Sequence, residues 1–151
     1  MHYITDTFSN KILQTAGLSW LVAQIIKVII TLICDKRLDF TKLFSSGGMP
    51  SSHAAFTVSL ASAVGFVTGF KSVEFAITAA FAFVVMYDAT GVRRSAGEQA
   101  RILNRIVDSL GHENISETGK KLKELLGHTP FEVFGGAILG VFIAVIFNIF
   151  A

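Results

Sequence analysis

Two histidines of this chain each stand where a polar segment enters an apolar stretch. His53 ends the segment 49–53 (Met-Pro-Ser-Ser-His), and His128 belongs to the segment 127–132 (Gly-His-Thr-Pro-Phe-Glu). Histidine changes its charge near neutral pH, so a pair of histidines can supply a nucleophile and an acid. A carboxylate behind one of them, at Glu132, can fix the tautomer of its imidazole. The two segments predict phosphoryl transfer or related acid–base chemistry.

The same segments also contain the signals of helix starts. Thr129, Pro130 and Glu132 fit the cap, first and third positions of a capping box. The carboxylate therefore has a structural alternative, which is to accept a hydrogen bond from a backbone N–H. In the earlier segment, Ser51 or Ser52 is suited to cap the following helix. Helix N-termini favour anions, so two of them facing one compartment predict a phosphate cradle.

The composition indicates the setting in which these residues must work. The chain has 151 residues, of which 52% are hydrophobic and 16% are charged, against about 25% charged in an ordinary soluble domain. We therefore predict a single membrane-embedded domain over residues 1–151. The net charge of +2 does not argue for a nucleic-acid partner, and the single Cys34 excludes an intrachain disulfide. The start of the chain has no basic region, so no cleaved signal peptide is expected.

Four stretches are nearly free of charge: 17–34, 53–70, 73–87 and 131–151. A helix that spans a bilayer needs about 20 residues, with a usual range of about 17–25. The third stretch is the shortest, and the other three reach this length. We predict an all-α integral membrane bundle of four transmembrane helices. Four apolar helices in the core of a soluble protein are the alternative.

The basic residues predict an orientation for this bundle. With four spans, the loops 35–52 and 88–130 lie on one side. They carry Lys36, Arg37, Lys42, Arg93, Arg94, Arg101, Arg105, Lys120, Lys121 and Lys123, whereas the other side carries Lys11 and Lys71. Because cytoplasmic loops are rich in Lys and Arg, we expect these main loops in the cytoplasm and both termini outside.

The long loop has a pattern of its own. Apolar residues recur at helical spacing and polar ones fill the other face: Ala100, Leu103, Ile106, Val107 and Leu110 against Arg101, Asn104, Arg105 and Asp108. This pattern predicts an amphipathic helix on the cytoplasmic surface, ended by Gly111. A second short helix is expected over residues 116–126. Its lysines are suited to anionic lipid head groups, with a solvated helix face as the alternative.

Further polar residues belong to the side where the histidines are expected. Lys27 lies inside the first span, where an ionisable residue is costly and either faces a polar cavity or extends to the interface. Asp88 either pairs with Arg93 or Arg94, or belongs to the site. A metal site would need His53, Asp88, Glu98 and His128, which lack compact ligand spacing. The pairs Gly65/Gly69 and Gly136/Gly140 indicate close helix packing.

Three segments carry a resemblance to a known family. Residues 47–55, together with 87–94 and 126–133, resemble the motifs of the type 2 phosphatidic acid phosphatases and vanadium-dependent haloperoxidases. The combination is similar to the divergent, four-span branch found in bacteria and plants, and it extends over about residues 20–140. The resemblance implies a location in a bacterial plasma or inner membrane.

This resemblance also implies roles for individual residues. His53 is the general acid that protonates the leaving alcohol, His128 is the nucleophile that forms a phosphohistidine, and Glu132 orients His128. Candidates to bind the substrate phosphate are Lys27, Ser51, Ser52, Asp88, Arg93 and Arg94. The implied activity is that of a phosphatase for lipid phosphate monoesters that uses no metal and no cofactor.

Several positions depart from the family's pattern. Ser52 stands in place of the motif glycine. Cys34 and Asp35 replace an Arg-Pro pair, and Leu122 replaces an arginine. These departures leave a second hypothesis open, a non-catalytic lipid-binding or scaffold protein that retains the pocket. A small transporter or channel subunit is a third, suggested by the intramembrane lysine. Four spans make a thin bundle, so a homodimer is a further expectation.

Overall fold

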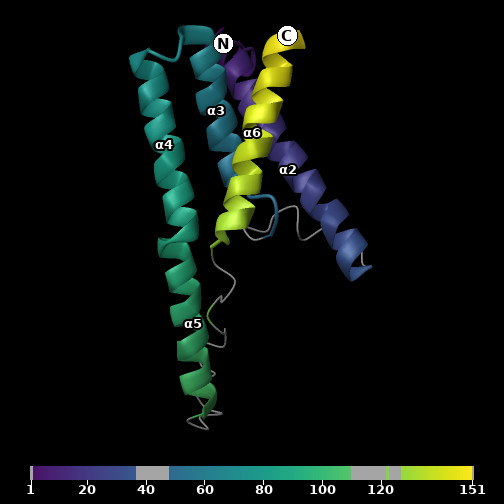
Figure 1. Cartoon of the computed structure of the whole chain (residues 1–151), viewed down its shortest axis with the longest axis vertical. Helices are drawn as coiled ribbons and strands as arrows, with labels where there is room; N and C mark the ends of the chain where they lie inside the picture. Colours follow the sequence, from purple (N-terminus) through teal and green to yellow (C-terminus); the bar gives the residue numbers. More distant parts are fainter. Residues whose placement is uncertain (1, 37–47, 110–121, 123–126, 151) are drawn as a thin grey trace.

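The computed structural model describes residues 2–36, 48–109, 122 and 127–150 (Figure 1). All regular structure in these residues is helical, which confirms the predicted class. The helices are α1 (His2–Phe8), α2 (Lys11–Asp35), α3 (Ser52–Thr68), α4 (Val73–Thr90), α5 (Val92–Ser109) and α6 (Pro130–Phe150). The short helix α1 was not predicted from the sequence.

Three long helical segments are long and apolar enough to cross a membrane: Lys11–Cys34, Val73–Ser109 and Pro130–Ile149. The shorter apolar helix is α3, with 17 residues, so the expectation that 73–87 is the short span was wrong. The apolar run does end there, but the helix does not. Thr90 remains helical, its hydroxyl donates to the carbonyl of Met86 at 3.0 Å, and α4 reaches 18 residues.

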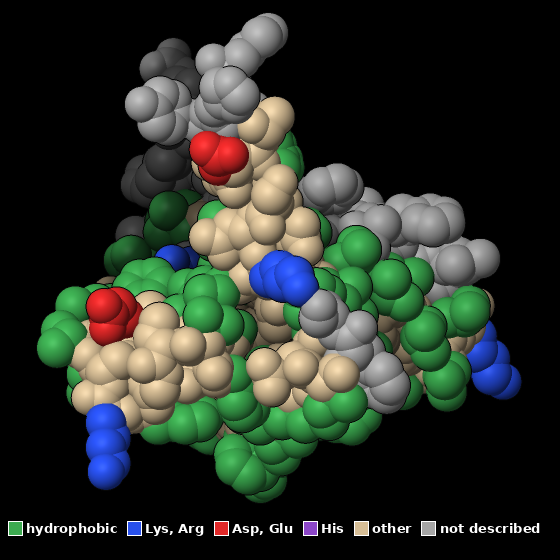
Figure 2. Space-filling model, turned by 90° about the horizontal axis from the view of Figure 1, so that it is seen from above, with side chains coloured by type: hydrophobic (Ala, Val, Ile, Leu, Met, Phe, Trp, Pro, Cys, Tyr) green, Lys and Arg blue, Asp and Glu red, His purple; other side chains and the backbone are tan. Residues whose placement is uncertain are grey.

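Small and polar side chains fill the inside of the bundle, while large apolar ones cover its outside. The largest side chains that are fully buried among the described residues are Ser19, Ser51, Ser52 and Ser59. Exposed positions include Ile33, Phe134 and Ile149, each at least 66% exposed. Seen from the end of both termini, hydrophobic side chains form most of the visible rim (Figure 2). This distribution is the reverse of a soluble core and fits a lipid-facing surface.

Helix α3 lies at the centre and packs against α6, α2 and α4. Glycines of α6 permit the closest approach. A Cβ at Gly140 would lie 2.7 Å from the carbonyl oxygen of Ala55, and one at Gly136 would collide with that of Ser51. The packing role predicted for this glycine pair is confirmed.

The other predicted glycine pair divides between two roles. Gly65 lies under the rings of Phe70 and Phe75, where a Cβ would meet an atom of Phe70 at 2.5 Å. Gly69 ends α3 with a φ of 93° and has nothing within 4 Å of the Cβ position. Only Gly65 therefore serves close packing, and Gly69 permits the left-handed turn after the helix.

Both termini lie at one end of the bundle, whereas the C-terminal end of α2 and the N-terminal ends of α3 and α6 lie toward the other end (Figure 1). This arrangement brings the two histidine segments to the same end, as the sequence predicted. The predicted amphipathic helix forms within α5. It continues the line of α4 beyond the bundle (Figure 1), however, and does not turn across the end of the bundle.

Asn104 corrects one detail of that helix. It was expected on the polar outer face, but it is buried, and its amide forms two hydrogen bonds with the backbone of Leu122, at 2.9 and 3.0 Å. These bonds hold the returning chain against α5. Of the predicted helix 116–126, the structure describes only Leu122, which is not in a helix; the lysines of that segment and the helix end at Gly111 lie outside the described residues.

Candidate active site

The segment before α6 forms the capping box that the sequence predicted. The backbone N–H of Thr129 donates to Oε2 of Glu132 at 2.9 Å, and the N–H of Glu132 donates to Oγ1 of Thr129 at 3.3 Å. Pro130 is the first residue of α6. These reciprocal bonds fix the geometry of the turn that carries the preceding histidine.

Glu132 also holds His128, so its structural and chemical alternatives are both realised. The same Oε2 lies 3.0 Å from Nδ1 of His128. Because a carboxylate only accepts, we assign the ring proton to Nδ1, which leaves a lone pair on Nε2. Nε2 is buried and has no hydrogen-bond partner among the described residues. An oriented imidazole with a free lone pair can act as a nucleophile.

Two backbone contacts that the sequence analysis did not foresee place His128. Its N–H donates to the carbonyl of Ala89, near the end of α4, at 2.9 Å. Gly127 has a φ of 90°, and a Cβ there would lie 2.5 Å from the backbone nitrogen of Arg94. Only glycine fits this position. In the sequence, this role of Gly127 was indicated only by its position directly before His128.

His53 faces His128 across the end of the bundle. It is the second residue of α3, and its ring centroid lies 6.4 Å from that of His128, with the ring planes tilted by 58°. The rings line a pocket together with Val85, Asp88, Ala89, Arg93 and Gly127. The pocket measures about 30 Å³, which is room for one or two water molecules.

Lys27 is inside the bundle and does not extend to the interface. Its side chain is 3% exposed, and its Nζ donates to Oγ of Ser52 at 3.2 Å. Ser51 has a structural role, because its Oγ accepts from the N–H of Ala54 at 3.4 Å and its own N–H donates to the carbonyl of Glu132 at 2.8 Å. The cap of α3 is therefore bonded directly to the first turn of α6.

The two arginines have different positions. Nε of Arg93 pairs with Oδ2 of Asp88 at 2.6 Å, and both side chains are partly exposed at the wall of the pocket. This is one of the two arrangements expected for Asp88. Arg94 is exposed and is not among the residues that line the pocket. The structure thus brings Arg93 to the histidines and leaves the side chain of Arg94 outside.

Burial lowers the pKa of His128 below its ordinary value of 6.5. The hydrogen bond that His128 donates to Glu132, and the negative charge of Glu132, act in the opposite direction, whereas the positive charges of Lys27 and Arg93 lower the pKa further. The imidazole of His128 is therefore neutral at pH 7, which is the form that has a lone pair for attack.

Of the four residues weighed as metal ligands, His53, Asp88 and His128 line one pocket, but Glu98 does not. Glu98 pairs with Arg101 at 2.9 Å, on α5. Within the described part of the chain, no three His, Cys, Asp or Glu side chains form a group that could hold a metal ion.

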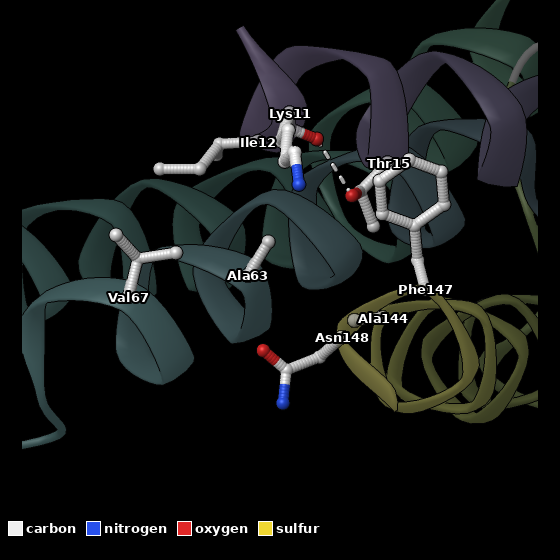
Figure 3. Close-up of a pocket in the computed structure, with 8 residues that line it drawn as sticks. All are labelled: Lys11, Ile12, Thr15, Ala63, Val67, Ala144, Phe147 and Asn148. Carbon is white, nitrogen blue, oxygen red and sulfur yellow. Dashed lines mark hydrogen bonds between the residues drawn. The ribbon is translucent and has the colours of Figure 1, made fainter. Parts of the chain in front are cut away.

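A second pocket, of about 160 Å³, lies at the opposite end of the bundle, between α2, α3 and α6 (Figure 3). Lys11, Ile12, Thr15, Ala63, Val67, Ala144, Phe147 and Asn148 line it. The hydroxyl of Thr15 donates to the backbone carbonyl of Lys11 at 2.7 Å. Because both histidines of the site lie at the other end, we assign this pocket no part in their chemistry.

Fold and site together define a helical membrane protein with two histidines at one end of its bundle, one of them oriented by a carboxylate. The chain belongs to the Divergent PAP2 family, whose family model matches residues 8–143. It is 42% identical over 155 residues to a Bacillus subtilis (strain 168) protein named "Uncharacterized membrane protein YuiD", with 96% of this chain and 98% of that protein covered. No solved structure matches the chain. The resemblance found in the sequence is thereby confirmed.

Proposed function

We propose that this protein is a metal-independent phosphatase for lipid phosphate monoesters that works through a phosphohistidine. The observation that carries the proposal is the state of His128. One ring nitrogen is held by Glu132 at 3.0 Å, and the other is buried with no hydrogen-bond partner among the described residues. Membership in the Divergent PAP2 family supports the same chemistry.

The reaction has two displacement steps. In the first, Nε2 of His128 attacks phosphorus, the bond from phosphorus to the alcohol oxygen breaks, and His53 donates a proton to that oxygen. In the second, His53 accepts a proton from a water molecule, which attacks the phosphohistidine and releases inorganic phosphate. Glu132 stabilises the imidazolium in between.

Positive charge near the histidines supports this assignment. The phosphoryl oxygens carry developing charge during both steps, and fixed cationic donors stabilise it. Lys27 and Arg93 lie close enough to His128 for their charges to lower its pKa. Ser52, which accepts from Lys27 at 3.2 Å, holds the ammonium in place. Lys27, Ser52 and Arg93 are therefore the phosphate-binding residues of the proposal. Of the three, Arg93 lines the pocket of the histidines. Lys27 is proposed for its buried charge close to His128, and Ser52 for its bond to that lysine.

The membrane location favours a lipid substrate over a soluble ester. The family relative is a membrane protein by name, and the outside of the bundle is apolar. We place the site at the cytoplasmic face, because the basic residues Lys36, Arg93 and Arg94 lie toward its end of the bundle. This placement takes the predicted four spans, with both termini outside. Phosphatidate, phosphatidylglycerophosphate and a polyprenyl phosphate suit such a site equally.

The intermediate can be tested directly. Purified protein is mixed with a lipid phosphate labelled with ³²P in its phosphate group, quenched with base within milliseconds, and examined for protein-bound label, since phosphohistidine survives base. We expect label on the peptide that contains His128, and none in His128→Asn. Release of phosphate by the His128→Asn variant at the rate of the wild type would overturn the proposal.

A non-catalytic role in lipid binding is the second candidate, and one observation favours it. Arg93 is held by Asp88 at 2.6 Å, so part of its charge is already compensated and is not fully available to a phosphate. A protein of this kind would bind a lipid phosphate without turnover, and its binding would survive His128→Asn. The labelling experiment separates the two candidates, because the binding protein acquires no covalent label.

A further inference from the structure

An apolar groove runs along the outside of the bundle between α4 and α6. Four residues of each helix line it: Phe83, Met86, Tyr87 and Thr90 from α4, and Pro130, Val133, Phe134 and Ala137 from α6. Its volume is about 360 Å³, far more than the pocket at the histidines. The groove exists because these two helices make few contacts with each other, while both pack on α3.

One end of this groove lies at the histidines. Thr90 follows Ala89, whose carbonyl accepts the hydrogen bond from His128, and Pro130 comes two residues after that histidine. In the interior, Val133 of the groove packs with Ala89 and Ala54 in one buried cluster. The groove and the pocket therefore lie on two sides of the contact between the end of α4 and the start of α6.

The chemistry of the lining differs between the two spaces. The pocket contains two histidines and a pair of opposite charges, whereas the groove has apolar walls, with the hydroxyls of Tyr87 and Thr90 near its site end. From Pro130 to Ala137 the groove follows seven residue steps of α6, which is roughly 10 Å at about 1.5 Å per residue. A molecule with a phosphate at one end and a hydrocarbon chain at the other matches this division.

We propose that the groove between α4 and α6 binds a hydrocarbon chain of the lipid phosphate while its phosphate group lies at the histidine pocket. This inference rests on the proposed function and adds to it the class of substrate: an ester with at least one extended chain, which reaches the site laterally from the bilayer. Because the chain comes from an equally apolar bilayer, it is van der Waals packing along the groove that binds it and positions the phosphate, and a soluble phosphate ester cannot make these contacts.

The test fills the groove without touching the pocket. Ala137 is at the end of the groove that is remote from His128, so Ala137→Trp blocks the chain and leaves the histidines in place. Ile138→Trp is the matched control, because the next residue of the same helix is exposed and does not line the groove. Each variant is assayed with a long-chain phosphatidate in mixed micelles and with the soluble ester p-nitrophenyl phosphate.

We expect Ala137→Trp to raise KM for the long-chain lipid by roughly 10-fold with little change in kcat. The reason is that the lost contacts hold the chain equally well in the bound substrate and in the transition state. The soluble ester and the Ile138→Trp control should behave as in the wild type. Equal kinetics of Ala137→Trp and wild type on the long-chain lipid would overturn the inference while leaving the phosphatase intact. Absence of activity in the wild type on both substrates would instead refute the proposed function.

Two further measurements cover the other outcomes. If Ala137→Trp does not fold, Ala137→Leu replaces it, with a smaller increase of KM expected for the long chain alone. A groove that binds a second copy of this chain would show itself as a change of particle mass in Ala137→Trp, with both substrates affected alike, and that result overturns the inference. In the wild type, a phosphatidate with a photoreactive group on its chain should label α4 or α6, and labelling confined to other helices would contradict it.

Discussion

One oxygen of Glu132 accepts two hydrogen bonds, from the backbone of Thr129 at 2.9 Å and from the ring of His128 at 3.0 Å. The helix cap and the orientation of the nucleophile are thus two uses of one carboxylate. A variant that keeps an oxygen acceptor but removes the negative charge should separate them.

Glu132→Gln is that variant. The amide oxygen can still accept from the N–H of Thr129, so the thermal midpoint in detergent should stay close to that of the wild type. The imidazolium formed during the reaction loses its stabilising charge, so kcat should fall by roughly 100-fold. Phosphate release and thermal unfolding, measured on one preparation, give both values. A variant with unchanged kcat would show that the carboxylate serves the helix cap alone.

The pH dependence tests the protonation state of His128. Burial and the charges of Lys27 and Arg93 lower its pKa from 6.5, and only the neutral form attacks. His53 must be protonated to act as the acid. Burial together with the charges of Arg93, His128 and Lys27 lowers its pKa as well. Log(kcat/KM) should therefore fall on the acid side as the pH drops through the lowered pKa of His128, and on the alkaline side as His53 loses its proton. Removing the positive charge in Arg93→Gln raises the pKa of His128, so the acid limb should move to higher pH, whereas Arg93→Lys should keep it in place. A limb that moves to lower pH in Arg93→Gln contradicts this sign.

Residues of the site differ in how far the sequence could predict them. The capping box and the histidine before it are local patterns, readable from the spacing of Thr129, Pro130 and Glu132. The burial of Lys27 and its bond to Ser52 depend on how α2 packs on α3, which no local pattern contains. The residues at the helix starts could therefore be assigned to the site from the sequence. The position of Lys27, which reaches the site from another helix, could not be predicted.

Among the elements, the turn at Gly127 packs against the backbone of Arg94 near the start of α5. It thereby places the loop that contains His128 against that helix. The sequence shows Gly127 only as part of the segment 127–132, because its close contact with the backbone of Arg94 is a tertiary contact that no local pattern predicts. The length of α4 was underestimated for a related reason: hydropathy marks where the apolar run ends, but the helix continues through polar residues as far as Thr90.

The variant Gly127→Ala tests whether this turn positions His128. A Cβ would lie 2.5 Å from the backbone nitrogen of Arg94, at a φ of 90°, so the loop must move at a cost of about 1–3 kcal/mol. We expect a lower thermal midpoint together with a lower kcat.

Gly17→Ala is the control for that variant. Gly17 lies within α2, and a Cβ there has nothing within 4 Å. It should therefore be neutral or stabilise the helix by about 0.5–1 kcal/mol. Equal thermal midpoints and equal kcat for the two variants would show that the turn tolerates a side chain and is not what positions His128.

For the whole molecule, the distribution of side chains determines how it sits in the bilayer. Buried serines and alanines with exposed isoleucines and phenylalanines follow from the hydropathy of the chain, so the membrane class was predictable from composition. The orientation is a prediction from charge. Lys36, Arg93 and Arg94 lie toward the histidine end, whereas Lys11 and Lys71 lie toward the end of the termini.

Cysteine labelling tests this orientation. In a Cys34→Ser background, Lys71→Cys places a thiol in the turn between α3 and α4, and Ser95→Cys places one on exposed α5. A thiol reagent that cannot cross the membrane should label Lys71→Cys in intact cells and Ser95→Cys only after lysis, because basic loops stay in the cytoplasm. The opposite pattern would place the histidines outside the cell.

The central claim is that His128 and His53 together hydrolyse a lipid phosphate without a metal. The most direct measurement is phosphate release by detergent-purified protein from a panel of lipid phosphate monoesters, with EDTA present, beside His53→Ala and His128→Ala. We predict release by the wild type and loss of it in both variants, each with its fold intact. No release by a well-folded wild type across the panel, or undiminished release by His128→Ala, would contradict the account.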